Sequence, residues 1–177
     1  MKNFTWDQTF KDLFQRSLEK YRAGESDLNG YFSEADNAFL QKIGYKPREF
    51  FDFVEDLEDY GAPSMESAIL IASVRRDYLH TMQDGQLSDH EISPSDLPGK
   101  DEELGRYRWL PRIIVKATAK LKGELDPDIM YSCGGDRGFL TAHDIHPADF
   151  LRVVWSADSG EDKDKILDFM KQASKGY

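Results

Sequence analysis

Two segments of this chain align with each other without a gap at an offset of 100 residues. They are residues 31–54 and 131–154, and seven of the 24 aligned positions carry the same residue. The identical pairs are Tyr31/Tyr131, Asp36/Asp136, Phe39/Phe139, Leu40/Leu140, Pro47/Pro147, Phe50/Phe150 and Val54/Val154. Self-similarity at a fixed offset is typical of repeated architectures, so the pattern predicts an internal duplication with a unit of roughly 70 residues.

Apolar residues recur at steps of three and four along both copies, which is the pattern of amphipathic helices with one buried face. The first long segment of each copy carries this pattern at Phe10, Leu13, Phe14, Leu18 and Tyr21, and at Leu110, Ile113, Ile114, Ala117 and Leu121. No segment alternates with a period of two. The sequence therefore predicts an all-α fold of two homologous helical units, about four helices each, packed as an internal duplication.

The ends of the shorter helices carry recognisable signals. We expect Asp36 and Asp136 to open the second helix of each unit as N-caps, because a carboxylate accepts hydrogen bonds from unpaired backbone N–H groups. Gly44 is a suitable left-handed stop for that helix in the first copy, and Asp144 occupies the same place in the second. Proline, which loses no needed donor at the first position of a helix, stands at the expected start of the third helix in each unit, at Pro47 and Pro147.

The chain divides at an acidic stretch rich in serine, glycine and proline. We expect one helical unit over residues 1–82, a linker over residues 83–105 and a second unit over residues 106–177. A connection of this length is long for a compact domain. We interpret it as a solvated connector, with a segment folded over the surface as the alternative.

Composition limits the classes of partner. The chain has 33 acidic and 23 basic residues, a formal net charge of −10 and a pI near 4.9. Such a surface repels nucleic acid and anionic membranes, so we expect neither as a partner. The single cysteine excludes an internal disulfide, and no apolar run is long enough to be a signal peptide core or a membrane span. We expect a cytoplasmic protein, with no cofactor predicted.

Residues 104–175 resemble a bacterial family known as domain-of-unknown-function family 5069. The resemblance lies in a lysine- and alanine-rich helix followed by a tyrosine/cysteine/aspartate stretch and a third helix, here residues 116–123, 131–140 and 146–154. Residues 4–80 are a diverged copy of the same pattern. The resemblance implies a helical fold and leaves the activity open.

The loop and helix after Tyr131 contain several side chains that could take part in catalysis or bind a metal. Cys133 as a nucleophile, with Asp136 and His143 nearby, would make a small enzyme, and adding His146 would offer ligands to a metal. However, a histidine at position 143 falls on the apolar side of its helix, and Pro147 breaks the helix at His146. We therefore interpret the cluster as packing and capping residues, predict no metal, and keep the enzyme, possibly metal-assisted, as the alternative.

Basic residues follow one another along the first helix of the second unit. Arg108, Arg112, Lys116 and Lys120 are spaced by four, so we expect them to form one stripe beside the buried face. The alternative is a solvated face or one that pairs with acidic residues of the chain. The leading functional hypothesis is a non-enzymatic binding or adaptor protein that recognises an acidic partner or a small anion through this helix. The sequence does not predict an oligomeric state.

Overall fold

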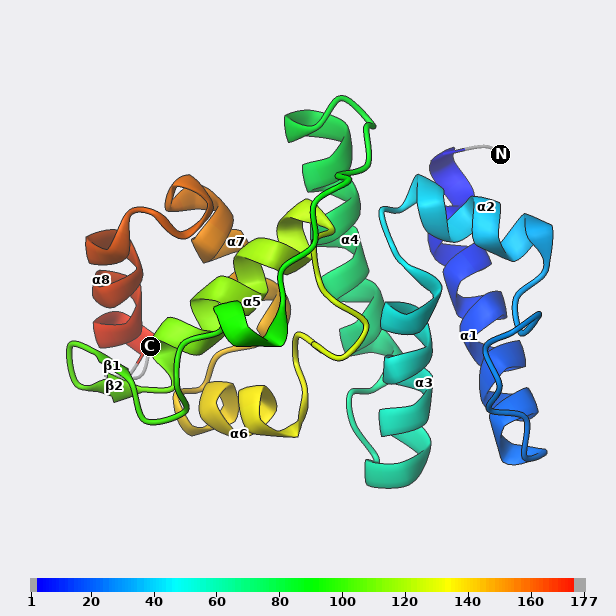
Figure 1. The fold of residues 1–177 in the computed structure, drawn as a ribbon, viewed down its shortest axis with the longest axis horizontal. Coiled ribbons are helices and arrows are strands. Elements are labelled where there is room, and N and C mark those ends of the chain that lie inside the picture. The colour runs from blue at the N-terminus through cyan, green and yellow to red at the C-terminus, as the bar shows by residue number, and fades with distance from the viewer. Residues whose placement is uncertain (1–2, 174–177) are drawn as a thin grey trace. The chain divides into compact units, whose positions relative to one another are not determined.

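The computed structural model describes residues 3–173, which are mostly helical (Figure 1). Eight α-helices lie in this range: α1 (Trp6–Arg22), α2 (Glu34–Lys42), α3 (Pro47–Tyr60), α4 (Met65–Met82), α5 (Leu110–Lys122), α6 (Gly134–Ala142), α7 (Pro147–Ser156) and α8 (Lys163–Ala173). Short 3-10 turns occupy Asn3–Thr5, Pro94–Asp96 and Asp158–Gly160. The prediction of a helical fold is confirmed.

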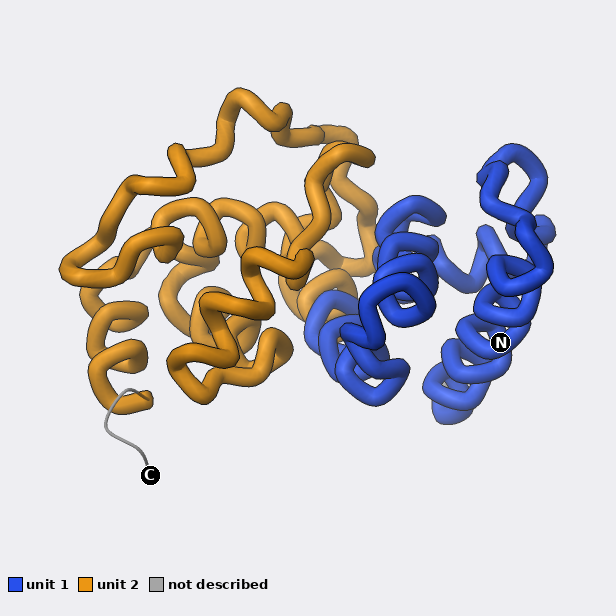
Figure 2. The backbone as a smooth tube through the Cα atoms, turned by 90° about the horizontal axis from the view of Figure 1, so that it is seen from below, with its two compact units in different colours: residues 1–76 blue, residues 77–177 orange. Residues whose placement is uncertain are grey.

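The chain forms two compact units, Met1–Arg76 and Asp77–Tyr177, coloured separately in Figure 2. The division falls inside α4, earlier than the expected end of the first unit at residue 82. Residues 83–105 belong to the second unit and do not form a separate linker.

Each unit buries the apolar stripe of its first helix. In the first unit Phe10, Leu13 and Phe14 of α1 are buried, and Phe10 and Phe14 both lie edge-on to Phe50 of α3. In the second unit all five predicted core positions of α5 are buried: Leu110, Ile113, Ile114, Ala117 and Leu121. The three-and-four spacing thus identified the buried faces, because side chains at these steps share one side of a helix.

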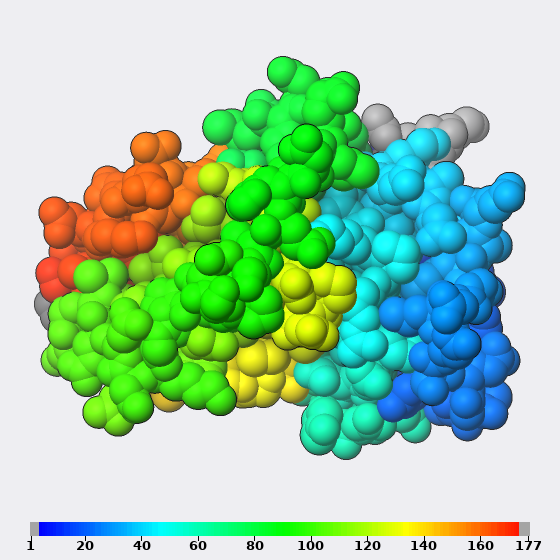
Figure 3. All heavy atoms as spheres, in the orientation of Figure 1, coloured from blue at the N-terminus to red at the C-terminus, as the bar shows by residue number. Residues whose placement is uncertain are grey.

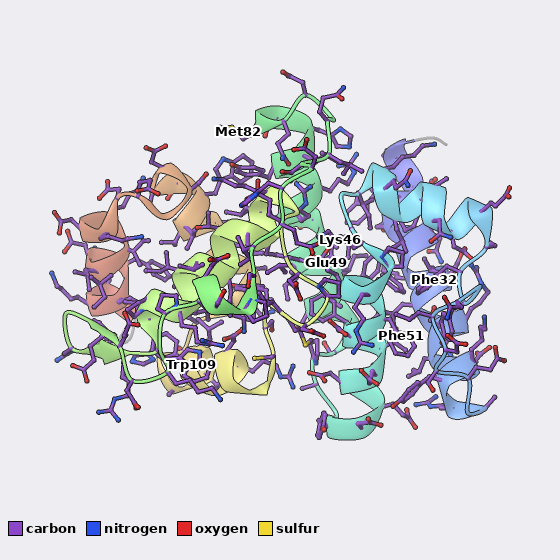
Figure 4. All side chains as sticks on the ribbon, in the orientation of Figure 1. Phe32, Lys46, Glu49, Phe51, Met82 and Trp109 are labelled. Atoms are coloured by element: carbon purple, nitrogen blue, oxygen red, sulfur yellow. The ribbon has the colours of Figure 1, made fainter. Side chains whose placement is uncertain are left out.

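The predicted starts and stops of the helices hold at several positions. Pro47 and Pro147 occupy the first positions of α3 and α7. The Glu49 carboxylate accepts a hydrogen bond from the Lys46 backbone N–H at the start of α3, where Figure 4 shows the two side by side. Gly44 ends α2 with a φ of 77°, and Asp144 takes the same left-handed conformation after α6 with a φ of 56°.

Two local predictions were wrong. The N-cap residues of α2 and α6 are Ser33 and Cys133, because the helices begin earlier than expected. Asp36 instead stands at the third helical position and accepts a hydrogen bond from the Ser33 N–H, completing a capping box. A short antiparallel hairpin, which no sequence pattern indicated, precedes α5 and is formed by β1 (Glu103–Leu104) and β2 (Tyr107–Arg108).

Candidate functional site

A buried ion pair joins α5 to α6 in the second unit. The Lys116 ammonium directly contacts a carboxylate oxygen of Asp136, and the two side chains are 5% and 0% exposed. Buried charges are retained at this depth only when they are paired and hydrogen-bonded. Asp136 meets this condition because it also accepts hydrogen bonds from the Trp109 indole N–H (2.9 Å) and the Ser132 backbone N–H (3.0 Å).

Cys133 lies beside this pair at the start of α6. The Lys116 ammonium donates a hydrogen bond to its sulfur at 3.2 Å, and the side chain is half-buried. The sulfur accepts no hydrogen bond from the first turn of α6, whereas the Ser33 hydroxyl of α2 accepts one from the Asp36 N–H. The first turn of α6 therefore begins without a side-chain cap, and its N–H groups present a positive end.

Trp109 closes one side of the cluster. It precedes α5 as its N-cap with a φ of 75°, a conformation that L-residues rarely adopt. The indole packs so tightly on Gly135 that a Cβ there would lie 2.7 Å from Trp109 Cζ2. Figure 4 shows Trp109 beside α6. Glycine at position 135 is thus required for the indole to reach Asp136.

A pocket of about 400 Å³ opens onto this cluster. Its lining residues come from residues 83–105, from Trp109 and α5, from the loop before α6 and from α6 itself: Pro94, Leu97, Lys100, Trp109, Arg112, Lys116, Asp128, Ile129, Met130, Cys133 and Gly135. The volume falls within the range of small-molecule sites in proteins. Apolar walls and a few convergent polar groups are the usual composition of such sites.

The segment of residues 83–105 forms one wall of the pocket. The Arg112 guanidinium donates to the Pro98 carbonyl at 2.8 Å, and the Ile92 N–H donates to the Glu124 carbonyl at 2.8 Å. In Figure 3 the segment (green) lies beside the yellow atoms of the loop before α6. The interpretation as a solvated connector was wrong, since these bonds hold the segment on the surface of the second unit.

The structure brings together only part of the predicted catalytic group. Cys133 and Asp136 both contact Lys116, but His143 ends α6 away from the pocket lining. The His143 ring is hydrogen-bonded to the Phe139 carbonyl at 2.8 Å and packs on two aromatic rings. It is a packing residue, as its place in the helix pattern indicated.

His146 has a structural role at the start of α7. Its Nδ1 accepts a hydrogen bond from the Ala148 N–H at 3.1 Å, which makes it the N-cap of that helix. Within residues 3–173, no three histidine, cysteine, aspartate or glutamate side chains are grouped so that they could hold a metal ion.

The basic residues do not form the exposed stripe that the spacing indicated. Arg108 lies in β2 and is exposed, with its guanidinium near Asp101 and Glu103. Lys116 and Lys120 are buried. Of the four, Arg112 and Lys116 line the pocket.

Sequence reasoning missed Trp109, Lys100 and the pairing of Lys116 with Asp136. One signal could have found the pair: the offset of 100 places Arg16 opposite Lys116 and Asp36 opposite Asp136. In the first unit Arg16 and Asp36 also form an ion pair, at 2.7 Å. No sequence pattern indicated Lys100, which comes from the segment interpreted as a linker.

The first unit has a pocket at the corresponding place, with a different balance of charge. It measures about 630 Å³ and includes the charged residues Arg16, Lys20, Glu19, Glu25 and Asp36. Three carboxylates face two cations there, and Lys20 is occupied by Glu25 and by the Tyr31 carbonyl. The second-unit pocket is the more suitable of the two for an anion.

Tyr131, which precedes the cluster, is held neutral. Burial raises the pKa of Tyr131 well above its usual value, and the nearby Asp136 carboxylate raises this pKa further. The phenol hydroxyl donates to the Pro147 carbonyl at 2.8 Å. This hydrogen bond ties the loop before α6 to the start of α7 and gives Tyr131 a structural role.

No family model, curated protein or solved structure matches this chain. Among the described residues, no helix is long and apolar enough to cross a membrane. The geometry of the pocket in the second unit is therefore the basis for a functional assignment.

Proposed function

We propose that this protein is a non-enzymatic binding protein whose second unit holds a small organic anion in the pocket before α6. The observation that carries the proposal is the convergence of Lys100, Arg112 and Lys116 on one pocket in a chain with a net charge of −10. Against these three cations stand two carboxylates, Asp136, which pairs with Lys116, and Asp128 in the pocket lining, so one positive charge is in excess.

The start of α6 adds a second attraction for an anion. Gly135 lines the pocket in the first turn of α6, and that turn has no side-chain cap. N–H groups at a helix N-terminus bind phosphate and carboxylate groups, and the helix dipole favours negative charge there. In α2, by contrast, the Ser33 hydroxyl caps the first turn by accepting a hydrogen bond from the Asp36 N–H.

The remaining lining residues are apolar and favour an anion that also carries an apolar organic group. Leu97, Ile129, Met130 and the Trp109 indole supply apolar surface around the charged groups. Apolar contacts provide most of the affinity in pockets of this kind, and polar groups fix the orientation. A carboxylate or phosphate ester with an apolar or aromatic body fits this combination better than an inorganic ion.

Thermal-shift and calorimetric titrations with aromatic carboxylates, aliphatic carboxylates and phosphate esters test the proposal. A ligand at ~100 times its dissociation constant adds about 2.7 kcal/mol to the free energy of unfolding. We expect Arg112→Met to weaken binding at least ~10-fold. Arg108→Met removes the same charge outside the pocket and serves as the matched control. Absence of any saturable ligand, or equal loss in the two variants, would refute the proposal.

The second hypothesis, a small enzyme, is favoured by one observation. Cys133 and Asp136 converge on Lys116 at the pocket, although His143 takes no part. A thiol beside an ammonium group is the usual arrangement of a nucleophilic cysteine. Turnover of a bound thioester or activated acyl compound that is lost in Cys133→Ser would replace the binding hypothesis with this one.

We further propose that the two units arose by internal duplication. The bounds of the middle helices support this, since α2 and α6 cover residues 34–42 and 134–142, and α3 and α7 begin at Pro47 and Pro147. The paired positions Arg16/Asp36 and Lys116/Asp136 support it further. The family resemblance, the cytoplasmic location and the exclusion of nucleic acid stay predictions.

A further inference from the structure

The cysteine of this chain is part of the proposed anion pocket. Cys133 is the only cysteine in the sequence, and it lines the pocket with its side chain half-buried. The Lys116 ammonium, 3.2 Å from the sulfur, would pair with a thiolate formed there. The pocket therefore combines a group that can form a covalent bond with cations that can hold an anion beside it.

The residue before Cys133 is held in place through its backbone. The Ser132 backbone is held by the Asp136 carboxylate, and the Arg137 guanidinium donates to the Ser132 carbonyl at 2.6 Å. The Ser132 hydroxyl is fully buried and has no hydrogen-bond partner among the described residues. The loop thus presents the sulfur to the pocket at a fixed distance from Lys116, which favours a defined reaction geometry over a mobile surface thiol.

We propose that Cys133 captures a small anionic disulfide from the pocket as a mixed disulfide. This inference rests on the proposed function, because Lys100 and Arg112 would hold the carboxylate groups of the disulfide. The Cys133 thiolate attacks one sulfur of the bound disulfide, and a new bond forms between the two sulfurs. The old sulfur–sulfur bond breaks, and the other half leaves as a thiolate that takes up the proton released by Cys133.

In this proposal, the cations of the pocket make Cys133 react faster with a negatively charged disulfide than with a neutral one. A carboxylate on the reagent meets Lys100 and Arg112, whereas a neutral disulfide gains only the apolar contacts of the pocket. Lys116 acts on the sulfur and therefore on both reagents alike. The preference for an anionic reagent must then depend on Lys100 and Arg112, and overall thiol reactivity on Lys116.

Two coloured disulfides of opposite character give the test. Dithiobis(nitrobenzoate) carries carboxylates and dithiodipyridine is neutral, and each releases a thiol that is followed by its absorbance. The ratio of the two second-order rate constants is measured for the folded protein and for the same chain unfolded in urea, which supplies the intrinsic ratio of the reagents. We expect the folded ratio to exceed the unfolded ratio at least ~10-fold and to fall with salt.

Substitutions test which residues cause the preference for the anionic reagent. The double variant Lys100→Met, Arg112→Met is expected to return the ratio to that of the unfolded chain. Arg108→Met, the control outside the pocket, is expected to keep the wild-type ratio. Cys133→Ser must release no colour, and mass spectrometry of the wild-type product must show the added half-reagent on Cys133.

The outcomes separate this inference from the proposed function. If the carboxylate titrations succeed but folded Cys133 reacts with both disulfides no faster than the unfolded chain, covalent capture is refuted and anion binding stands. If the thiol reacts rapidly with the neutral reagent but the folded ratio equals the unfolded ratio, the cations do not select the reagent. That second result overturns both the anion pocket and the capture that depends on it.

Discussion

The buried ion pair between Lys116 and Asp136 makes a quantitative prediction about stability. Replacing Lys116 by methionine keeps most of the side-chain volume and removes the ammonium. The Asp136 carboxylate, which is completely buried, then keeps its hydrogen bonds from Trp109 and Ser132 but loses its counter-charge. Removing one partner of a buried pair costs about 3–5 kcal/mol, because an uncompensated charge stays in the interior.

The first unit contains a matched control. Arg16 and Asp36 pair at 2.7 Å at the corresponding positions, but their side chains are 57% and 21% exposed. Exposed pairs contribute about 0–1 kcal/mol because water and salt screen them. We therefore expect Arg16→Met to lower the free energy of unfolding by no more than about 1 kcal/mol, several-fold less than Lys116→Met.

A double-mutant cycle isolates the interaction from other effects of each substitution. Asp136→Asn leaves a buried ammonium without a counter-charge, and Lys116→Met leaves a buried carboxylate. The double variant buries neither charge, so its loss of stability should be smaller than the sum of the single losses by at least about 2 kcal/mol.

Urea unfolding, followed by tryptophan fluorescence and by far-ultraviolet circular dichroism, measures these free energies. The slopes against urea concentration must agree among the variants, so that changes in midpoint report stability. Hydrogen exchange of α5 and α6 locates the loss within the second unit. If the losses in unfolding free energy caused by Lys116→Met and Arg16→Met differ by less than about 1 kcal/mol, burial does not determine how much the ion pair stabilises the fold, and the prediction is refuted.

Three further predictions concern other parts of the fold. Gly135→Ala places a Cβ 2.7 Å from the Trp109 indole and should lower the free energy of unfolding by about 1–3 kcal/mol in urea titrations, whereas Gly138→Ala, with open space in the same helix, should raise it by about 1 kcal/mol. Asp144→Gly relieves the left-handed backbone after α6 and should raise the melting temperature, corresponding to about 0.5–1 kcal/mol; a lower melting temperature would contradict this. Burial raises the pKa of Tyr31 from 10.0 to about 12. The phenol therefore loses its proton at a lower pH in the unfolded chain than in the folded one, and the free energy of unfolding falls as the pH rises from 10 to 12. Tyr31→Phe should flatten this fall in unfolding free energies measured from pH 10 to 12, and an unchanged slope would exclude Tyr31 as its source.

The sequence predicted those parts of the fold that depend on local chemistry. Proline at the start of α3 and α7 and Gly44 after α2 act through the backbone of one or two residues, so their effect is readable without tertiary structure. The buried faces of α1 and α5 were predicted for the same reason, since helical spacing alone determines which residues share a side.

The parts that depend on distant contacts were not predictable in this way. Asp136 looked like a helix cap because an aspartate near a helix start usually is one. Its actual partners, Lys116 and Trp109, lie 20 and 27 residues earlier in the chain. The connecting segment was mistaken for a linker because a polar composition does not reveal the backbone hydrogen bonds that hold residues 83–105 in place.

The stripe prediction failed for a geometric reason. A helix turns about 100° per residue, so a step of four residues overshoots a full turn by about 40°. From Arg112 to Lys120 the overshoot adds up to about 80°, enough to carry the series from the partly exposed pocket wall into the core, where Lys120 is 1% exposed. Arg108 precedes the start of α5 and was never part of the helical series.

The two units differ in the surroundings of their corresponding ion pairs. The pair Arg16/Asp36 is partly exposed, whereas the pair at the corresponding positions, Lys116/Asp136, is buried. At the offset of 100 residues, Trp109 corresponds to Thr9 and donates to Asp136, and Cys133 corresponds to the capping Ser33. These two residues distinguish the chemistry of the second unit from that of the first. Under the duplication proposed above, the two units keep this ion pair as a common framework, and the thiol and the indole are additions of the second unit.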